Sequence, residues 1–263
     1  MPYNATTGLA PAQCAEPISR MWQVQTARPP GERYDFTMPF AKAVTMVLIK
    51  ARHNLAQQLT ADLHGISQPT VSRIWRYLIP LIGQVTAMDR KHLVEALDRG
   101  VVLIDGAPIP TGNRTGTGTT NWNAKHRKQA LGVQVAARLG GDLVAVSDPT
   151  RGSRHDSRAL EEVGWAEQIT AAREDNPLLA VFADTAYSKH TKLTPRRKKK
   201  GVERTEEDRD WNRKISSMRA AVERAIAHLK QWKILSTGYR GRLAELPSVI
   251  HMITNLEFYR QAT

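Results

Sequence analysis

The sequence lacks what several classes of protein require. Cys14 is the only cysteine among the 263 residues, which excludes an internal disulfide and a cysteine-rich zinc site. No apolar run reaches the ~18 residues that a membrane helix needs, and the best candidate is the short run from Ala43 to Ile49. The first residues lack the basic segment and apolar stretch of a secretory signal. We therefore expect a cytoplasmic protein without a membrane partner.

Acidic residues are also in deficit. Lys and Arg number 38 against 25 Asp and Glu, which gives a formal net charge of +13. Such an excess favours an anionic partner, most often nucleic acid, although a merely solvated basic surface would carry the same charge. Hydrophobic residues make up 41% of the chain, enough for a globular protein with a real core. The composition therefore favours a nucleoid-associated protein.

The hydrophobic pattern divides the chain into three parts. Residues 1–34 carry Ala, Pro, Gly and Thr without a clear period, which predicts a loosely ordered leader. Residues 35–90 follow a helical pattern, which predicts an all-α domain. Residues 99–260 alternate strands and helices, and no internal repeat is found.

In the third part, two strands joined by adjacent glycines predict an antiparallel hairpin. Strands are expected at residues 101–105, 129–139, 142–148 and 178–184, and helices at 157–172 and 213–231. Three antiparallel strands, a helix, a further strand and a helix are the order of an RNase H-like α/β fold. We expect a mixed sheet flanked by helices.

The stretch "LTADLHGISQPTVSRIWRYL", from Leu59 to Leu78, has the spacing of a helix-turn-helix motif. Gly65 stands where the turn requires a positive φ, and Ser67 is a good N-cap for the second helix. An ordinary helical hairpin with a polar outer face is the alternative, but the basic charge favours DNA binding. The second helix is expected to expose side chains that reach phosphates and base edges in a major groove, namely Gln68, Thr70, Ser72, Arg73 and Arg76.

Two apolar runs each end in an aspartate. "VVLID" ends at Asp105, and "AVFAD" ends at Asp184. Asp105 alone could simply cap the following turn, since Asp-Gly is a common turn pair. Neighbouring strands, however, can bring both carboxylates to one edge of a sheet, where two like charges usually need a cation. Oxygen ligands without cysteine point to Mg²⁺ or Mn²⁺.

Two further carboxylates are candidates. Glu223 follows Arg219 and precedes Lys230 along one margin of the apolar stripe in "RAAVERAIAHLKQWKIL", so it can point towards the sheet edge. A plain surface ion pair between Arg219 and Glu223 is the alternative, and such pairs are worth only ~0–1 kcal/mol. Asp156, in "GSRHD", is a weaker metal candidate, since it also suits the N-cap of the following helix.

Five segments in this order resemble the Harbinger-like DDE superfamily endonucleases, which include many bacterial insertion-sequence transposases. The segments are "VVLIDGAPI", "KHRKQALGVQV", "DPTRGSRHDSRAL", "FADTAY" and "VERAIAHLKQWKIL", and with the helix-turn-helix the resemblance spans roughly Leu59 to Asn255. It implies an RNase H-like nuclease whose metal-binding triad is Asp105, Asp184 and Glu223. The family pattern also carries an Asp in the Gly-x-x-His-Asp segment, which here is Asp156.

The sequence departs from the family pattern in two places. Ala186 stands where Gly is commoner, and a Thr-rich insert precedes Trp122. Neither departure removes a carboxylate, although either could alter rate or DNA fit.

The resemblance implies a transposase that uses two divalent ions, Mg²⁺ or Mn²⁺, to cleave phosphodiesters at the element ends. The freed 3′-OH would then be joined to target DNA. Double-stranded DNA, as the element's inverted repeats and as target, is the expected partner, and a homodimer on the DNA is compatible with it. A non-catalytic DNA-binding regulator, a decayed transposase and a nuclease without strand transfer are the alternatives.

Basic residues of the third part are expected to hold DNA phosphates. The run at residues 196–200 is either such a contact or a solvated loop. The individual DNA contacts expected outside the helix-turn-helix are Lys125, Arg127, Lys128, Arg219 and Lys230.

Overall fold

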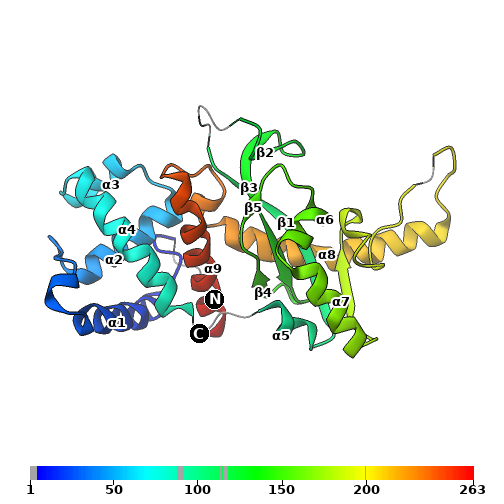
Figure 1. The fold of residues 1–263 in the computed structure, drawn as a ribbon, viewed down its shortest axis with the longest axis horizontal. Coiled ribbons are helices and arrows are strands. Elements are labelled where there is room, and N and C mark those ends of the chain that lie inside the picture. Colours follow the sequence, from blue (N-terminus) through cyan, green and yellow to red (C-terminus); the bar gives the residue numbers. More distant parts are fainter. Residues whose placement is uncertain (1–4, 88–91, 113, 115–117, 199) are drawn as a thin grey trace. The chain divides into compact units, whose positions relative to one another are not determined.

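The computed structural model describes residues 5–87, 92–112, 114, 118–198 and 200–263 (Figure 1). The chain forms two compact units. One comprises residues 1–90 together with 229–263, and the other comprises residues 91–228. No helix within the described residues has the length and apolar character needed to cross a membrane.

The first unit is helical, as predicted for residues 35–90. Helix α4 (Gln68–Val85) packs against helix α9 (Leu246–Ala262), and Asn255 Nδ2 donates to the Gly83 carbonyl at 2.9 Å. Val71, Ile74, Trp75 and Leu78 of α4 are buried at helical spacing. The helices are α1 (Pro11–Ala27), α2 (Phe40–His53), α3 (Gln57–His64), α4 (Gln68–Val85) and α9 (Leu246–Ala262), with 3-10 turns η1 (Pro30–Glu32), η4 (Lys233–Leu235) and η5 (Leu243–Glu245).

The helix-turn-helix prediction is confirmed. Helix α3 ends at Gly65, whose φ of 66° lies in the left-handed region that glycine enters at no steric cost. Ser67 caps α4, because its Oγ accepts a hydrogen bond from the backbone N–H of Thr70 at 3.4 Å.

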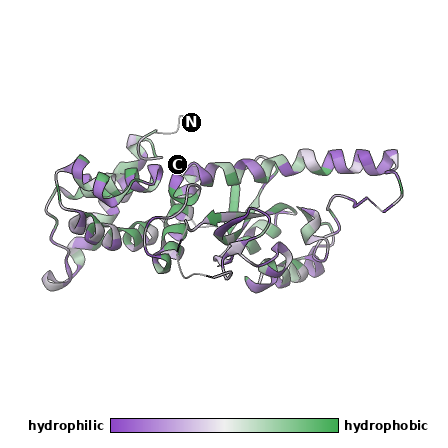
Figure 2. Cartoon of the chain, turned by 90° about the horizontal axis from the view of Figure 1, so that it is seen from above, coloured by the Kyte–Doolittle hydropathy of each residue, from purple (hydrophilic) through white to green (hydrophobic). Residues whose placement is uncertain are grey.

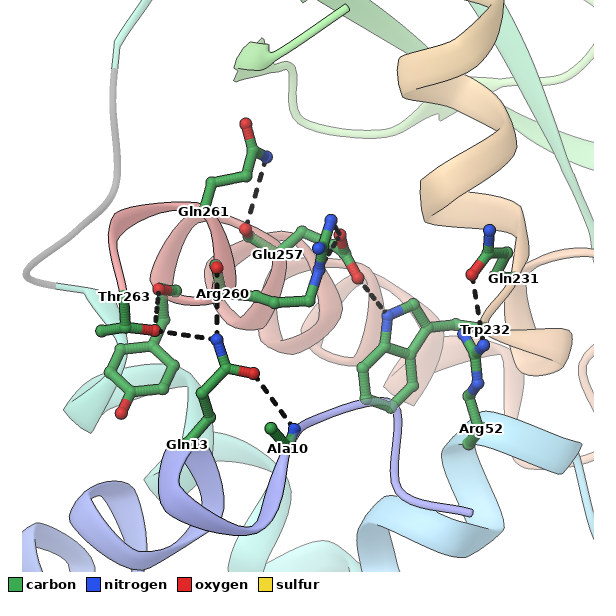
Figure 3. Close-up of polar contacts among 10 residues, drawn as sticks. Ala10, Gln13, Arg52, Gln231, Trp232, Glu257, Arg260, Gln261 and Thr263 are labelled. Carbon is green, nitrogen blue, oxygen red and sulfur yellow. Dashed lines mark hydrogen bonds and ion pairs between the residues drawn. The ribbon is translucent and has the colours of Figure 1, made fainter. Parts of the chain in front are cut away.

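The expected loosely ordered leader is wrong for half of its length, because residues 11–27 form helix α1. The buried positions of this helix are Pro17, Met21 and Gln25, so only Met21 gives the strong apolar signal on which the period depends. Figure 3 shows how its first turn is tied to the C-terminal helix. Gln13 Nε2 donates to Thr263 Oγ1 at 3.1 Å and to the Arg260 carbonyl at 3.4 Å.

The C-terminal segment also departs from the predicted boundaries, which placed residues up to 260 with the α/β part. Trp232 is fully buried in the first unit, and its Nε1 donates to Glu257 Oε1 at 2.6 Å (Figure 3). Arg260 donates to the other oxygen of this carboxylate from Nε and Nη2, at 3.0 and 2.9 Å. This buried, paired glutamate fixes α9 within the helical unit, which an alternation of strand and helix patterns does not reveal.

Lys50 of α2 offers a test of the packing of this unit. Its ammonium donates to the Leu55 carbonyl and lies 5.2 Å from the ring centroid of Trp75. Burial, and then the charge of Arg240, lowers the pKa of Lys50 from 10.5 to about 8. Between pH 8 and pH 10.5 this lysine is protonated in the unfolded chain and largely neutral in the folded one. The free energy of unfolding therefore rises with pH through this window. Below pH 8 the buried lysine is charged in the folded protein, which lowers the free energy of unfolding by up to about 3 kcal/mol.

We therefore expect the free energy of unfolding of wild type, relative to Lys50→Met, to increase between pH 7.5 and pH 10. Urea unfolding of both proteins at the two pH values measures this, and the comparison cancels groups that titrate in both. A difference that is independent of pH would contradict the lowered pKa of this lysine.

The second unit is built on the predicted mixed sheet. The strand order is β2-β3-β1-β6, and β4 and β5 also pair with β3. β1 is antiparallel to β3 and parallel to β6. The strands are β1 (Val101–Pro110), β2 (Trp122–Asn123), β3 (Lys128–Ala137), β4 (Leu143–Val146), β5 (Thr150–Arg151) and β6 (Ala180–Ala183).

Helices cover both faces of this sheet, with α6 and α7 in front and α8 behind in Figure 1. The core joins Val102 and Ile104 of β1 to Leu160, Trp165 and Ile169 of the front helices. The helices are α5 (Leu93–Leu97), α6 (Asp156–Glu162), α7 (Trp165–Asp175) and α8 (Glu206–Lys230), with the 3-10 turn η3 (Thr185–Tyr187) after β6.

Two predicted helices differ from the observed ones. The expected helix at 157–172 is divided by Gly164, whose φ of 74° breaks the helical path. The expected helix at 213–231 begins earlier, at Glu206, because acidic residues in its first turn suit the positive end of the helix dipole. Figure 2 shows α8 as the long rod at the upper right, where this added N-terminal part is mostly hydrophilic. Its polarity hides it from a search for apolar periodicity.

Candidate active site

Two aspartates lie side by side on the neighbouring strands β1 and β6, at the point where β6 ends. The parallel register pairs Ile104 with Ala183. Asp105 is the next residue within β1, and Asp184 is the first residue after β6. Their side chains are 15% and 27% exposed, and both face one guanidinium. Arg219 Nη2 lies 3.1 Å from Asp105 Oδ2 and 3.9 Å from Asp184 Oδ2. The two carboxylates meet as the sequence predicts, but the expectation that the strand ends at Asp105 is wrong, because β1 continues to Pro110 and pairs Asp105 with Val135 of β3.

Backbone hydrogen bonds orient the two carboxylates. The N–H of Gly106 donates to Asp105 Oδ1 at 2.9 Å, and the N–H of Thr185 donates to Asp184 Oδ1 at 2.6 Å. The Oδ2 atom of each aspartate is the one that faces the guanidinium. Burial raises the pKa of Asp105, and the Arg219 guanidinium is the largest opposing effect. The two aspartates are thus held close together, and a positive group beside them stabilises their charged form.

Asp156 lies against the same strand. Its Oδ1 is 2.7 Å from the position that a Cβ on Gly106 would occupy, so the glycine after Asp105 permits this approach. The expectation that Asp156 is the N-cap of the next helix is wrong, because His155 precedes the helix and Asp156 is its first residue. In the first turn its charge still interacts favourably with the helix dipole.

A tyrosine and a glutamine lie close to the carboxylates, and the sequence patterns indicate neither of them as a site residue. Tyr187 Oη donates to Gln134 Oε1 at 2.7 Å, and both side chains are buried. Burial, and then the three aspartates, raises the pKa of Tyr187 well above its usual value, so the phenol is neutral and serves as a donor. The available signals were the Tyr that follows "DTA" and one Gln within the apolar β3 sequence "LGVQVAA".

Glu223 is not gathered with these groups. It lies one turn beyond Arg219 on α8 and is exposed. Within the described part of the chain its carboxylate makes no hydrogen bond or ion pair, so the expected alternative, a surface pair with Arg219, is wrong. The described residues also contain no group of three or more His, Cys, Asp or Glu that could hold a metal ion.

A hollow lies beside Asp156 and is lined by basic side chains. Lys125 and His126 line it from the loop between β2 and β3, and Arg154 lines it from the loop after β5. Arg154 also pairs with Glu162 of α6 at 2.9 Å. Gly106, Gln134 and Asp156 form the side of the hollow that adjoins the carboxylates. Of the expected phosphate contacts, Lys125 thus lines the hollow, and Arg127 and Lys128 are exposed beside it in sequence.

The other expected phosphate contacts have varied positions. Arg219 faces the two aspartates, and Lys230 is half-buried at the last residue of α8. Arg196 of the basic run pairs with Glu207 and Asp208 of α8, at 3.0 and 2.9 Å. Arg197 Nη2 donates to the Thr185 carbonyl at 3.1 Å, which brings this run next to the turn after Asp184.

In the first unit, α4 exposes only part of the expected DNA-reading set. Arg73 and Arg76 are exposed, and Gln68 and Ser72 are half-buried. The expectation that Thr70 is exposed is wrong, since it is only 8% exposed. Its Oγ1 lies 2.9 Å from Ser67 Oγ and accepts from Arg73 Nη2, which makes it part of the helix cap.

Comparisons with known proteins match both the helix-turn-helix part and the α/β part of the chain. The family described as DDE superfamily endonuclease matches residues 104–257, and the helix-turn-helix of DDE superfamily endonuclease matches residues 37–86. No solved structure matches the chain.

Two curated relatives are transposases by name. The protein assigned as transposase for insertion sequence element IS112 of Streptomyces albus G is 26% identical over 87% of this chain and 83% of its own length. The one assigned to element IS702 of Microchaete diplosiphon is 33% identical over 35% of this chain and 32% of its own length. Since the family match covers more than half of the chain, the chain belongs to the DDE superfamily endonucleases, among the transposases of insertion sequences.

Proposed function

We propose that this transposase cuts DNA at the ends of its insertion sequence and joins the freed 3′ ends to target DNA, in a reaction that depends on divalent metal. The observation that carries the proposal is that Asp105 and Asp184, from adjacent parallel strands, both face the guanidinium of Arg219. The family to which the chain belongs agrees with a nuclease, and the net positive charge of the chain agrees with a DNA substrate.

The donor set fits a hard divalent ion. Asp105 and Asp184 offer oxygen atoms only, and their Oδ2 atoms already face a positive group. These two aspartates would hold Mg²⁺ or Mn²⁺, with Glu223 completing the ligand set and Asp156 as a further oxygen donor. Two such ions, when bound, lower the pKa of water and stabilise a leaving 3′-oxygen.

The chain's own groups orient this site and the DNA. The N–H groups of Gly106 and Thr185 hold the aspartates, and the Tyr187–Gln134 hydrogen bond ties the turn after Asp184 to β3. The exposed residues Lys125, Arg127 and Lys128 would hold backbone phosphates without reading sequence.

Sequence recognition would fall to the helix-turn-helix. Its second helix, α4, carries Gln68, Ser72, Arg73 and Arg76, which would contact phosphates and base edges in the major groove. Thr70 would act there only through the cap that it shares with Ser67.

The test is strand cleavage of DNA that carries the element's own ends, with Mg²⁺, with Mn²⁺ and with a chelator. We expect metal-dependent nicking at the ends and joined 3′-OH products from wild type, and neither from Glu223→Gln at equal DNA binding. Glu206→Gln is the matched control, because Glu206 is an exposed glutamate at the first residue of the same helix, more than three turns before Arg219.

The outcomes separate the proposal from its alternatives. Cleavage without joined products would favour a nuclease without strand transfer. Wild type that binds the ends but never cuts them would favour a regulator or a decayed transposase. Cleavage that persists in the chelator would contradict metal dependence.

A further inference from the structure

Arg219 lies where a metal-binding carboxylate pair would hold its cation. It extends from α8, and its side chain is only 17% exposed. Nη2 is the guanidinium atom that faces both aspartates. The same Oδ2 atoms that would bind a metal ion therefore already face a guanidinium.

The contact with the carboxylates is incomplete for an arginine. An arginine in a strong carboxylate pair usually donates through two parallel N–H groups. Here the hydrogen bond to Asp105 uses Nη2 alone, and Nε is buried without a partner among the described residues. The guanidinium balances the charge of the aspartates, but its own hydrogen-bonding capacity is only partly used. Replacement of the guanidinium by another cation would therefore break few hydrogen bonds.

A divalent ion and this guanidinium exclude one another at the pair. Both are positive and would need the same Oδ2 atoms, so a bound ion would repel the guanidinium at close range. Without either cation, two half-buried carboxylates would face each other, which is costly.

We propose that Arg219 is an intramolecular counter-ion of Asp105 and Asp184, which a divalent ion must displace before the site is loaded. The inference rests on the proposed metal-dependent function and adds a competition between metal and protein cation to it. Displacement by the metal ion would free the guanidinium from the aspartates. Arg219 could then contact a DNA phosphate, as the sequence predicts, which its present position against Asp105 does not allow. Glu223, one turn further along α8, would join the ligands as Arg219 leaves.

The test is Mn²⁺ binding to the DNA-free, full-length protein by titration calorimetry. We expect Arg219→Gln to bind Mn²⁺ about tenfold or more tightly than wild type, within the usual range for coupled sites. Arg224→Gln is the matched control, since it removes an exposed arginine of the same helix that makes no contact with the aspartates in the described structure. Its affinity should equal that of wild type.

Two further variants separate charge from shape and locate the ion. Arg219→Lys keeps the positive charge and should bind Mn²⁺ as wild type does. The double variant Asp105→Asn/Arg219→Gln should lose the tighter binding. Thermal unfolding gives a second readout, because Mn²⁺ should raise the melting temperature of Arg219→Gln more than that of wild type.

The negative outcomes are distinguishable. If Arg219→Gln binds Mn²⁺ no more tightly than wild type, or if Arg219→Lys binds as tightly as Arg219→Gln, the counter-ion inference is overturned and the proposed function stands. If none of these proteins binds Mn²⁺, the inference and the metal site of the proposed function both fail.

Discussion

Asp105→Asn and Asp184→Asn are each expected to slow cleavage at the element ends by about a thousandfold or more, which corresponds to about 4 kcal/mol of transition-state stabilisation. Each change replaces one negative oxygen with an amide nitrogen at the point where both Oδ2 atoms meet a cation. Single-turnover cleavage at saturating protein and Mn²⁺ measures the chemical step, and fluorescence anisotropy on the same DNA measures binding.

The variants should remain folded and should bind the DNA ends. Asn has the shape of Asp, and the backbone N–H groups of Gly106 and Thr185 can still donate to its side-chain oxygen. Asp175→Asn is the matched control, since it removes an exposed carboxylate at the end of α7 and should leave the cleavage rate unchanged. Near-normal cleavage by Asp184→Asn would remove this aspartate from the reaction.

The aspartate pair was predictable because strand signals are local. Two apolar runs, each followed by Asp, mark two strands, and the parallel pairing of these strands sets the two aspartates at the same level of the sheet, although β1 continues past Asp105 to Pro110. Pairing of Ile104 with Ala183 then sets Asp105 and Asp184 side by side. Likewise, Gly65 and Ser67 predict the helix-turn-helix from backbone requirements that act within a few residues.

The rest depends on tertiary packing that no local pattern carries. Arg219 and Glu223 occupy one margin of α8, and the sequence alone allowed a pair between them. Docking of α8 behind the sheet instead turns Arg219 onto Asp105. The burial of Glu257 with Trp232 and Arg260 is similar, because a charged residue in an apolar helix gives no sign of its partner until the two segments meet.

Gly152 is the position at which the smallest substitution should disturb the site most. A Cβ there would lie 2.0 Å from the Ala130 carbonyl oxygen and 2.7 Å from that of Asn121, and both are backbone atoms that cannot rotate away. The residue is buried where β5 leaves β3, and the chain runs from it through "SRH" to Asp156. Relief of the clash must move this segment, and Asp156 with it.

We expect Gly152→Ala to lower the free energy of unfolding by about 3 kcal/mol, at the upper end of what overpacking usually costs. Urea unfolding followed by circular dichroism measures it. Gly140→Ala is the matched control, because Gly140 is exposed and its new Cβ would meet only the Asp142 side chain, at 3.4 Å. The control should stay within about 0.5 kcal/mol of wild type. Equal stability of the two variants would mean that the segment before Asp156 yields freely and does not fix that carboxylate against β1.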